Sequence, residues 1–160
     1  LLSSQNTKMA NRVWIYQADR FLTDAEVETL QAFMSDFITQ WKAHGVSLDS
    51  DFEINNNLFL IIKVNEARQE ATGCSIDASV HAVKEIQGKL GINFFNRQRI
   101  AYQDSDGLKE CSMAEFKSLA KEGTVSADTP VFNNTVTTIE DFESSWKTVA
   151  AKSWHKMLLN

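Results

Sequence analysis

The sequence has few of the residues that mark specialised classes of protein. It contains two cysteines, three histidines and one proline among 160 residues. Cys74 and Cys111 are too few for the disulfide framework of a small secreted protein, so we expect free thiols. The cysteines and histidines show no CxxC, HxxxH or HExxH spacing, which zinc sites commonly have. The sequence therefore predicts neither a metal site nor a cofactor.

Positive charge and long apolar runs are also scarce. The chain carries 16 Lys and Arg against 21 Asp and Glu, for a net charge of −5. A nucleic-acid surface needs clustered Lys and Arg, so the composition argues against a nucleic-acid partner. The longest apolar run, LFLII at residues 58–62, is far short of the roughly 20 residues that span a bilayer. We therefore expect no membrane span and a cytoplasmic location.

The length and composition favour one domain. Residues 1–8 lack the basic start and the apolar core of a signal peptide, and Met9 has the character of a natural start, so we leave residues 1–8 out of the fold prediction. The 43% hydrophobic content is enough for a proper core. No repeat or linker marks a boundary, and we predict a single domain over residues 9–160.

The order of the predicted elements indicates an α+β fold. Residues 9–104 are predicted to contain a strand at 12–17, a helix from Thr23 to Gly45, strands at 52–54 and 58–64, a helix from Ser75 to Gly91, and a strand at 97–103. This is the βαββαβ order of ferredoxin-like domains. We therefore predict one antiparallel sheet with two helices on one face, in which the first and third strands are central.

Residues 105–160 are predicted to form a C-terminal α/β extension that packs on this core. The first strand carries large apolar side chains on both faces, as Trp14 and Ile15 illustrate, so the second face of the sheet also needs a cover. The extension contains a capping box that begins at Ser112 and a helical region at 138–159, and it can supply that cover. A homodimer that pairs two sheet faces is the alternative.

The stretch ATGCSID, residues 71–77, is where a loop is predicted to become the second helix. A helix start has unpaired N–H groups and a positive dipole end, which stabilise anions and thiolates. The predicted fold brings the end of the first helix and the end of the last strand to the same edge. The ligand-binding residues predicted there are Thr72, Gly73, Cys74, Ser75, Asp77, Tyr102 and Asp104.

A purely structural interpretation of the same stretch stays open. Ser75 can be the N-cap, Asp77 can complement the helix dipole, and Cys74 can be a small buried side chain. If Cys74 is a nucleophile instead, it needs a base within hydrogen-bond reach, and His44 is the candidate that the predicted fold places nearby.

Three hypotheses for the function follow. The first is a small ligand- or protein-binding domain with an anion site at residues 73–77, whose partner is an unidentified small anion or protein. The second is a thiol-dependent enzyme with Cys74 as nucleophile and His44 as base. The third is a structural subunit of a larger assembly. The sequence does not decide whether the protein is an enzyme.

Other residues allow two interpretations each. Arg97 and Arg99 lie on one face of a predicted edge strand, where they either hold an anion or protect the edge as solvated charges. Trp154 and His155 either line a pocket or dock the last helix onto the core. The stretch DSDG at 104–107 is similar to the start of a calcium loop, but the glutamate at the twelfth position is missing, which favours a hairpin turn.

Five short stretches together resemble one known family. They are VWIYQ at 13–17, ATGCSID at 71–77, FFNR at 94–97, VFNN at 131–134 and SWH at 153–155. The family consists of short, uncharacterised bacterial proteins with a TGCSID motif, and the resemblance covers residues 10–157. Members often carry the automatic label "ABC transporter ATPase", but this chain has no GxxxxGK[ST] loop to bind phosphates, so we expect no ATPase. The resemblance implies a family without an assigned activity.

Overall fold

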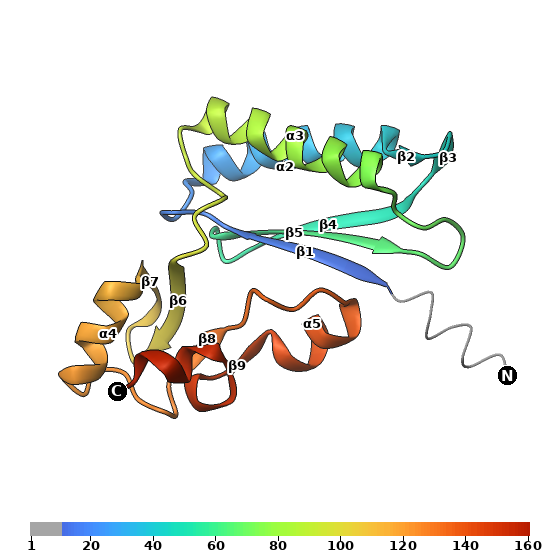
Figure 1. Cartoon of the computed structure of the whole chain (residues 1–160). Coiled ribbons are helices and arrows are strands. Elements are labelled where there is room, and N and C mark those ends of the chain that lie inside the picture. The colour runs from blue at the N-terminus through green and yellow to red at the C-terminus, as the bar shows by residue number, and fades with distance from the viewer. Residues whose placement is uncertain (1–10) are drawn as a thin grey trace, which may run out of the picture.

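The structure is a computed structural model that describes residues 11–160, so the predicted start at Met9 lies outside the described residues. Helices and antiparallel strands are both present, as the α+β prediction requires. Figure 1 shows the first part of the chain as two helices lying on a sheet, with the C-terminal part beneath and beside that sheet.

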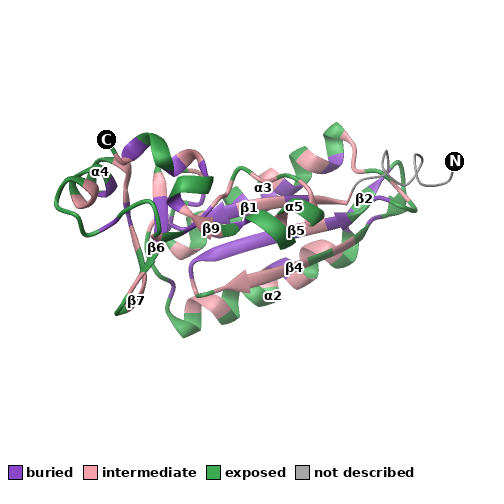
Figure 2. Cartoon of the chain, turned by 90° about the horizontal axis from the view of Figure 1, so that it is seen from below, coloured by how far each residue is buried: buried purple, intermediate pink, exposed green. Residues whose placement is uncertain are grey.

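The first sheet has three antiparallel strands with the most apolar one in the middle. In spatial order they are β1 (Arg12–Gln17), β5 (Phe59–Asn65) and β4 (Asp49–Asn55). Alternate residues of β5 face opposite sides of the sheet, and Phe59 to Ile62 are all 0% exposed; Figure 2 shows this burial along the strand. The predicted asparagine turn joins β4 to β5, with positive φ at Asn56 and Asn57.

Helices α2 (Asp24–Gln40) and α3 (Gly73–Leu90) cover one face of this sheet. The predicted capping box at the start of α2 is present, because Thr23 and Glu26 bind each other's backbone N–H groups. The predicted end of α3 at Gly91 is also confirmed, since this glycine is the C-cap with a φ of 66°.

The predicted end of the first helix is wrong. α2 ends at Gln40, and a small hairpin follows, made of β2 (Lys42–Ala43) and β3 (Val46–Ser47) with its turn at His44 and Gly45. Trp41 explains the early end, because its indole is buried and its Nε1 donates to the backbone oxygen of Ser75 at 2.7 Å. This bond ties the chain to the start of α3 in an extended conformation.

The strand predicted at residues 97–103 is present, but its predicted place in the ferredoxin-like sheet is wrong. This segment, β6 (Arg99–Asp104), belongs to a second sheet and does not pair with β1. The outer edge of β1 is instead met by a later segment: Val13 N–H donates to Thr137 O at 3.0 Å. β6 pairs along its whole length with the strand that follows it in the sequence. This short hairpin costs less loop-closure entropy than pairing with the distant β1.

The second sheet has a separate hydrophobic core. Its strands, in spatial order, are β7 (Gly107–Ser112), β6, β8 (Pro130–Phe132) and β9 (Lys147–Val149). Around it lie α4 (Met113–Lys121), capped by Ser112 and Glu115 as predicted, and 3₁₀ helices at Ala150–Lys152 and Trp154–Leu158. The helical region predicted at 138–159 is therefore divided by a strand. Phe116, at the centre of this core, is fully buried.

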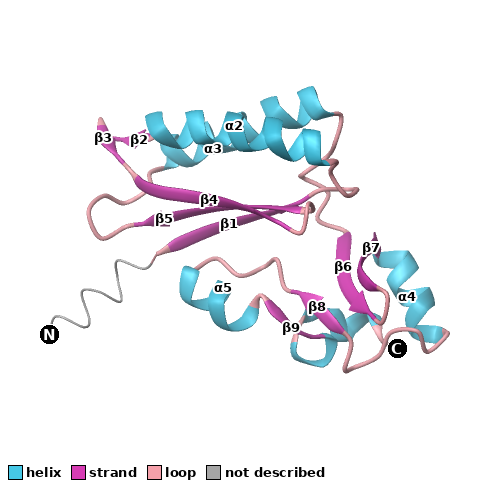
Figure 3. Cartoon of the chain, turned by 180° about the vertical axis from the view of Figure 1, so that it is seen from behind, coloured by secondary structure: helices cyan, strands magenta, loops and turns pink. Residues whose placement is uncertain are grey.

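The C-terminal part covers the second face of the first sheet, as one of the two alternatives predicts. Helix α5 (Ile139–Ser145) lies on the face opposite α2 and α3, as Figure 3 shows. Four aromatic rings from α5, from the first sheet and from the C-terminal part pack together: Phe59 of β5, Phe132 of β8, Phe142 of α5, and Trp146. We call these four residues the aromatic cluster. Through it, one continuous core joins the two parts of the chain.

Candidate functional site

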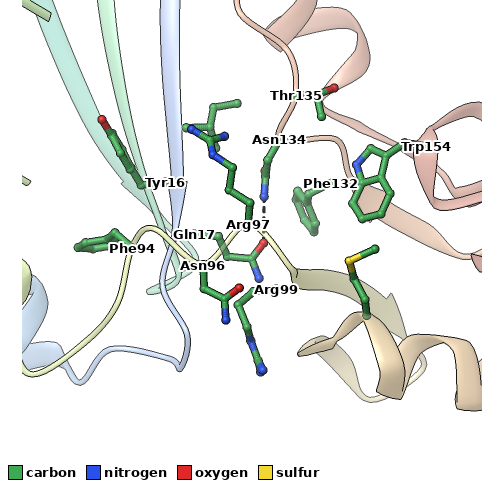
Figure 4. Close-up of a pocket in the computed structure, with 12 residues that line it drawn as sticks. Tyr16, Gln17, Phe94, Asn96, Arg97, Arg99, Phe132, Asn134, Thr135 and Trp154 are labelled. Atoms are coloured by element: carbon green, nitrogen blue, oxygen red, sulfur yellow. Dashed lines mark hydrogen bonds between the residues drawn. The ribbon is translucent and has the colours of Figure 1, made fainter. Parts of the chain in front are cut away.

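A cavity of about 240 Å³ lies where the two sheets meet, between the two hydrophobic cores. Its wall comes from the end of β1, the loop between α3 and β6 with the first residue of β6, the start of α4, the last residue of β8 with the loop after it, and the last 3₁₀ helix (Figure 4). Its lining residues are Ile15, Tyr16, Gln17, Phe94, Asn96, Arg97, Arg99, Met113, Phe132, Asn134, Thr135 and Trp154. The fold therefore brings five distant segments to one hollow.

A chain of hydrogen bonds fixes the amides at this cavity. Trp146 Nε1 donates to Asn134 Oδ1 at 2.9 Å, and Asn134 Nδ2 donates to Gln17 Oε1 at 2.9 Å. An indole N–H can only donate, so the atom that it meets must be the carbonyl oxygen of Asn134. The same logic makes Oε1 the atom of Gln17 that accepts the next bond. Gln17 consequently presents its NH₂ group to the remaining space.

That NH₂ group has no partner among the described residues. Gln17 is only 5% exposed, and its Nε2 is a buried side-chain nitrogen without a hydrogen bond. Figure 4 shows this nitrogen pointing away from Asn134, toward Asn96 and Arg99. A buried donor that loses its partner costs about 1–3 kcal/mol, so such a group in a native protein calls for an explanation. A ligand with an acceptor atom in this cavity supplies one.

The two arginines at the cavity have different electrostatic environments. Arg99 is neutralised by Glu110, to which both Nε and Nη2 donate. Arg97 takes part in none of the ion pairs within residues 11–160, and its side chain is exposed. Its charge nevertheless acts on a residue that lines the cavity. Burial raises the pKa of Tyr16, and the positive charge of Arg97 opposes this increase. Arg97 is thus the positive charge that the cavity offers to a ligand.

The amide side chains at the cavity present donors. Among residues 11–160, no Asp or Glu lines the cavity. Asn96 Oδ1 accepts from Gln98 N–H at 3.0 Å, which leaves the Asn96 NH₂ group as a second donor. Thr135 Oγ1 is bound to Asn133 Oδ1 at 2.5 Å. A group that accepts hydrogen bonds therefore suits these amide donors.

The rest of the lining is apolar and largely aromatic. In Figure 4 the rings of Tyr16 and Phe94 lie on one side of Gln17 and Arg97, and those of Phe132 and Trp154 lie on the other. Apolar walls with a few convergent polar groups are typical of sites for small molecules. The arrangement can hold a small molecule that is apolar over most of its surface.

The predicted site around residues 71–77 is less promising. Thr72, not Ser75, is the N-cap of α3, and the two residues form a reciprocal capping box. Ser75 is buried, whereas Gly73, Cys74 and Asp77 are exposed. The capping box satisfies the exposed helix end without a ligand.

Two other predicted site residues, Tyr102 and Asp104, lie elsewhere. Tyr102 packs edge-on against Phe116 in the second core, and the carboxylate of Asp104 accepts from Asp106 N–H at 2.8 Å in the turn between β6 and β7. Both are at the end of the molecule opposite the start of α3, because β6 is absent from the first sheet (Figure 1). His44 is exposed in the hairpin turn that replaces the predicted helix end, and no described residue hydrogen-bonds the sulfur of Cys74.

The two cysteines should differ sharply in alkylation. Cys74 is exposed, whereas Cys111 is buried and its pKa is raised to about 12, chiefly by burial and also by the nearby Glu115. The thiolate is the reactive form, so Cys111 should stay unlabelled in the folded protein at pH 8. Peptide mass spectrometry after treatment with iodoacetamide should find the label on Cys74 alone. Equal labelling without denaturant would contradict the burial of Cys111.

Comparisons with known proteins yield no relative. No protein-family model, curated protein or solved structure matches the chain. Within residues 11–160, no helix has the length and apolar character to cross a membrane. The same residues hold no group of three or more His, Cys, Asp and Glu placed for a metal ion. The cavity geometry therefore carries the functional argument.

The sequence contained a partial signal for this site. Of the five stretches that resemble a bacterial family, four contribute lining residues: 13–17, 94–97, 131–134 and 153–155. Arg97, which one interpretation assigned to an anion site, and Trp154, which one interpretation placed in a pocket, both line the cavity. Gln17 and Asn134 were missed, because only the fold brings residues 117 positions apart into contact.

Proposed function

We propose that this protein is a small-molecule-binding domain and that its site is the cavity between the two cores. The observation that supports this most directly is the buried, unpaired Nε2 of Gln17, held in place by Asn134 and Trp146. An acceptor atom of a ligand would supply the hydrogen bond that this buried nitrogen lacks within residues 11–160. The proposal keeps the ligand-binding hypothesis but moves the site from residues 73–77 to Gln17.

The dimensions of the cavity suit a ligand with one ring. Its volume is about 240 Å³, whereas an engineered apolar cavity of about 150 Å³ in another protein binds benzene. The extra space allows one short polar substituent. A ring between the walls formed by Phe94, Phe132 and Trp154 would gain the offset or edge-to-face contacts that aromatic groups favour.

Binding of benzamide tests the proposal. Benzamide has one ring and one carbonyl acceptor, and it should produce saturable shifts of the Gln17 side-chain NH₂ and the Trp154 indole N–H in a ¹⁵N–¹H spectrum. The spectrum assigns the shifts to residues, so binding elsewhere on the surface is recognised. A protein that shows no such shifts at millimolar benzamide would refute the proposal.

Filling the cavity should abolish this binding. Met113 lines the cavity at the first turn of α4 and is only partly buried, so a larger side chain there can enter the hollow with little strain on the core. We expect Met113→Trp to weaken benzamide binding by about tenfold or more, because the indole occupies the ligand volume. Met113→Leu conserves the volume and should bind as the wild type does. Both variants should keep the wild-type spectrum away from the cavity, which shows that they are folded.

A further inference from the structure

We infer that the ligand of this cavity is a planar monocarboxylate, in which one acid group is attached to a single flat apolar ring. This inference rests on the proposed function and names the chemical class of the ligand. It follows from three properties of the lining: its net charge, the kind of hydrogen-bonding atoms that it presents, and the shape of its apolar walls.

The charge of the lining matches one negative charge. Glu110 neutralises Arg99, no acidic residue lines the cavity, and Arg97 has no ion-pair partner within residues 11–160. A monoanion is therefore balanced by Arg97 alone. A phosphate ester with nearly two negative charges would leave an excess charge beside apolar rings, which is unfavourable.

The hydrogen-bonding atoms match a carboxylate in kind. Gln17 and Asn96 both present amide NH₂ groups because their carbonyl oxygens already accept bonds from Asn134 and Gln98. An ionised carboxylate only accepts hydrogen bonds, through two oxygens with about four lone-pair positions. Arg97 adds a planar guanidinium, which binds carboxylates through two parallel N–H···O bonds. A neutral amide or alcohol group would satisfy fewer of these donors, because it carries a single acceptor oxygen.

The walls favour a flat body for this acid. Gln17 and Arg97 lie between two pairs of aromatic rings, Tyr16 with Phe94 and Phe132 with Trp154 (Figure 4). The acid group is expected beside the Gln17 NH₂ group, with the ring against the aromatic side chains. In Figure 4 the Arg97 guanidinium points away from this NH₂ group, so Arg97 reaches the acid only after its exposed side chain turns toward it. This pose would satisfy the Gln17 donor and exclude water from the apolar walls.

The test compares three one-ring probes: benzoate, benzamide and phenyl phosphate. The wild type should bind benzoate about tenfold more tightly than benzamide, since hydrogen bonds to a charged group are stronger than those to a neutral one. Calorimetric or NMR titrations at low salt measure both affinities. Phenyl phosphate should bind more weakly than benzoate because the cavity balances only one charge.

Substitution of Arg97 should remove this preference. Arg97→Gln leaves the core intact, because the side chain is exposed, and should bring the affinity for benzoate down to that for benzamide. Arg97→Lys should restore part of the preference through its charge. The matched control is Arg68→Gln, which removes one positive charge from the loop between β5 and α3, at the other end of the molecule (Figure 1), and should leave the preference unchanged.

The outcomes separate the two proposals. If benzamide binds at Gln17 but benzoate binds no more tightly, or if Arg97→Gln keeps the preference, the monocarboxylate inference is wrong and the small-molecule site stands. Tighter binding of phenyl phosphate than of benzoate would also overturn the monocarboxylate. If none of the probes shifts the Gln17 and Trp154 signals, both proposals fail.

Discussion

Replacement of Trp146 by alanine should destabilise the protein by about 3–5 kcal/mol, the range for truncation of a buried large aromatic residue. Trp146 is 2% exposed, and its ring centroid lies 4.8 Å from that of Phe132 and 4.9 Å from those of Phe59 and Phe142. The substitution would leave a hole at the centre of the aromatic cluster, where the C-terminal part is joined to the first sheet. Urea denaturation of the two proteins at pH 7 measures this loss.

A conservative substitution separates packing from hydrogen bonding at this position. Trp146→Phe keeps a ring in the cluster but leaves Asn134 Oδ1 without its donor, which should cost about 1–3 kcal/mol. It also removes the bond that fixes the orientation of the Asn134 and Gln17 amides, so benzamide should bind more weakly to a folded protein. Trp14→Phe is the control, because no described residue accepts a bond from the Trp14 indole. A loss below about 1 kcal/mol for Trp146→Ala would contradict the central place of this residue.

Elements that depend on neighbouring residues could be predicted from the sequence. The capping boxes at Thr23 and Ser112 each need only a partner three residues away, and the turn at Asn56 and Asn57 needs only residues that tolerate positive φ. Gly45 misled the prediction because it marks a turn with positive φ in a hairpin as readily as at a helix end. The side chain that ends the helix, Trp41, acts through a contact 34 residues away.

The choice of strand partners could not be predicted in the same way. The strand pattern of β6 is the same whether it pairs with β1 or with β7 and β8, because alternation describes a strand and not its neighbour. The edge of β1 is occupied by residues near Thr137, in a segment that forms a single isolated bridge and no strand. This misplacement carried Tyr102 and Asp104 into a predicted site to which neither belongs.

The cavity could not be predicted from the sequence for a related reason. A helix start such as residues 71–77 is recognisable locally, so it attracted the functional interpretation. The cavity depends instead on Gln17 and Asn134, whose roles exist only after β1 and the loop after β8 meet. A glutamine at the end of an apolar strand is ordinary in sequence, and its burial without a partner is a property of the fold.

Acidification should destabilise the protein through one buried histidine. His155 is 1% exposed, packs between Phe116 and Trp154, and its Nδ1 is hydrogen-bonded to Ser153 Oγ. No carboxylate among residues 11–160 forms an ion pair with it. Burial therefore lowers its pKa from 6.5 to about 4.

The sign of the effect follows from where the proton binds. Between pH 6.5 and about 4 the unfolded chain protonates His155 and the folded protein does not, so the free energy of unfolding falls as the pH falls through this interval. The full loss is about 3 kcal/mol, from the size of the pKa shift. Urea denaturation from pH 7 to pH 4.5 should show most of it. More than about one pH unit above 6.5 this histidine contributes almost no slope, because it is neutral in both states.

Carboxylates that are stabilised in the folded state also lose stability in acid, but they act at lower pH. The pKa of Glu26 is lowered from 4.5 to about 2 by its hydrogen bond with Arg20 and by the capping box, so its contribution declines only below pH 4.5. The interval between pH 6.5 and 4.5 therefore isolates the histidine. His155→Asn is neutral throughout and should flatten the curve there, whereas the same change at the exposed His81 should not. A wild-type protein equally stable at pH 7 and pH 5 would show that His155 is not buried as a neutral group.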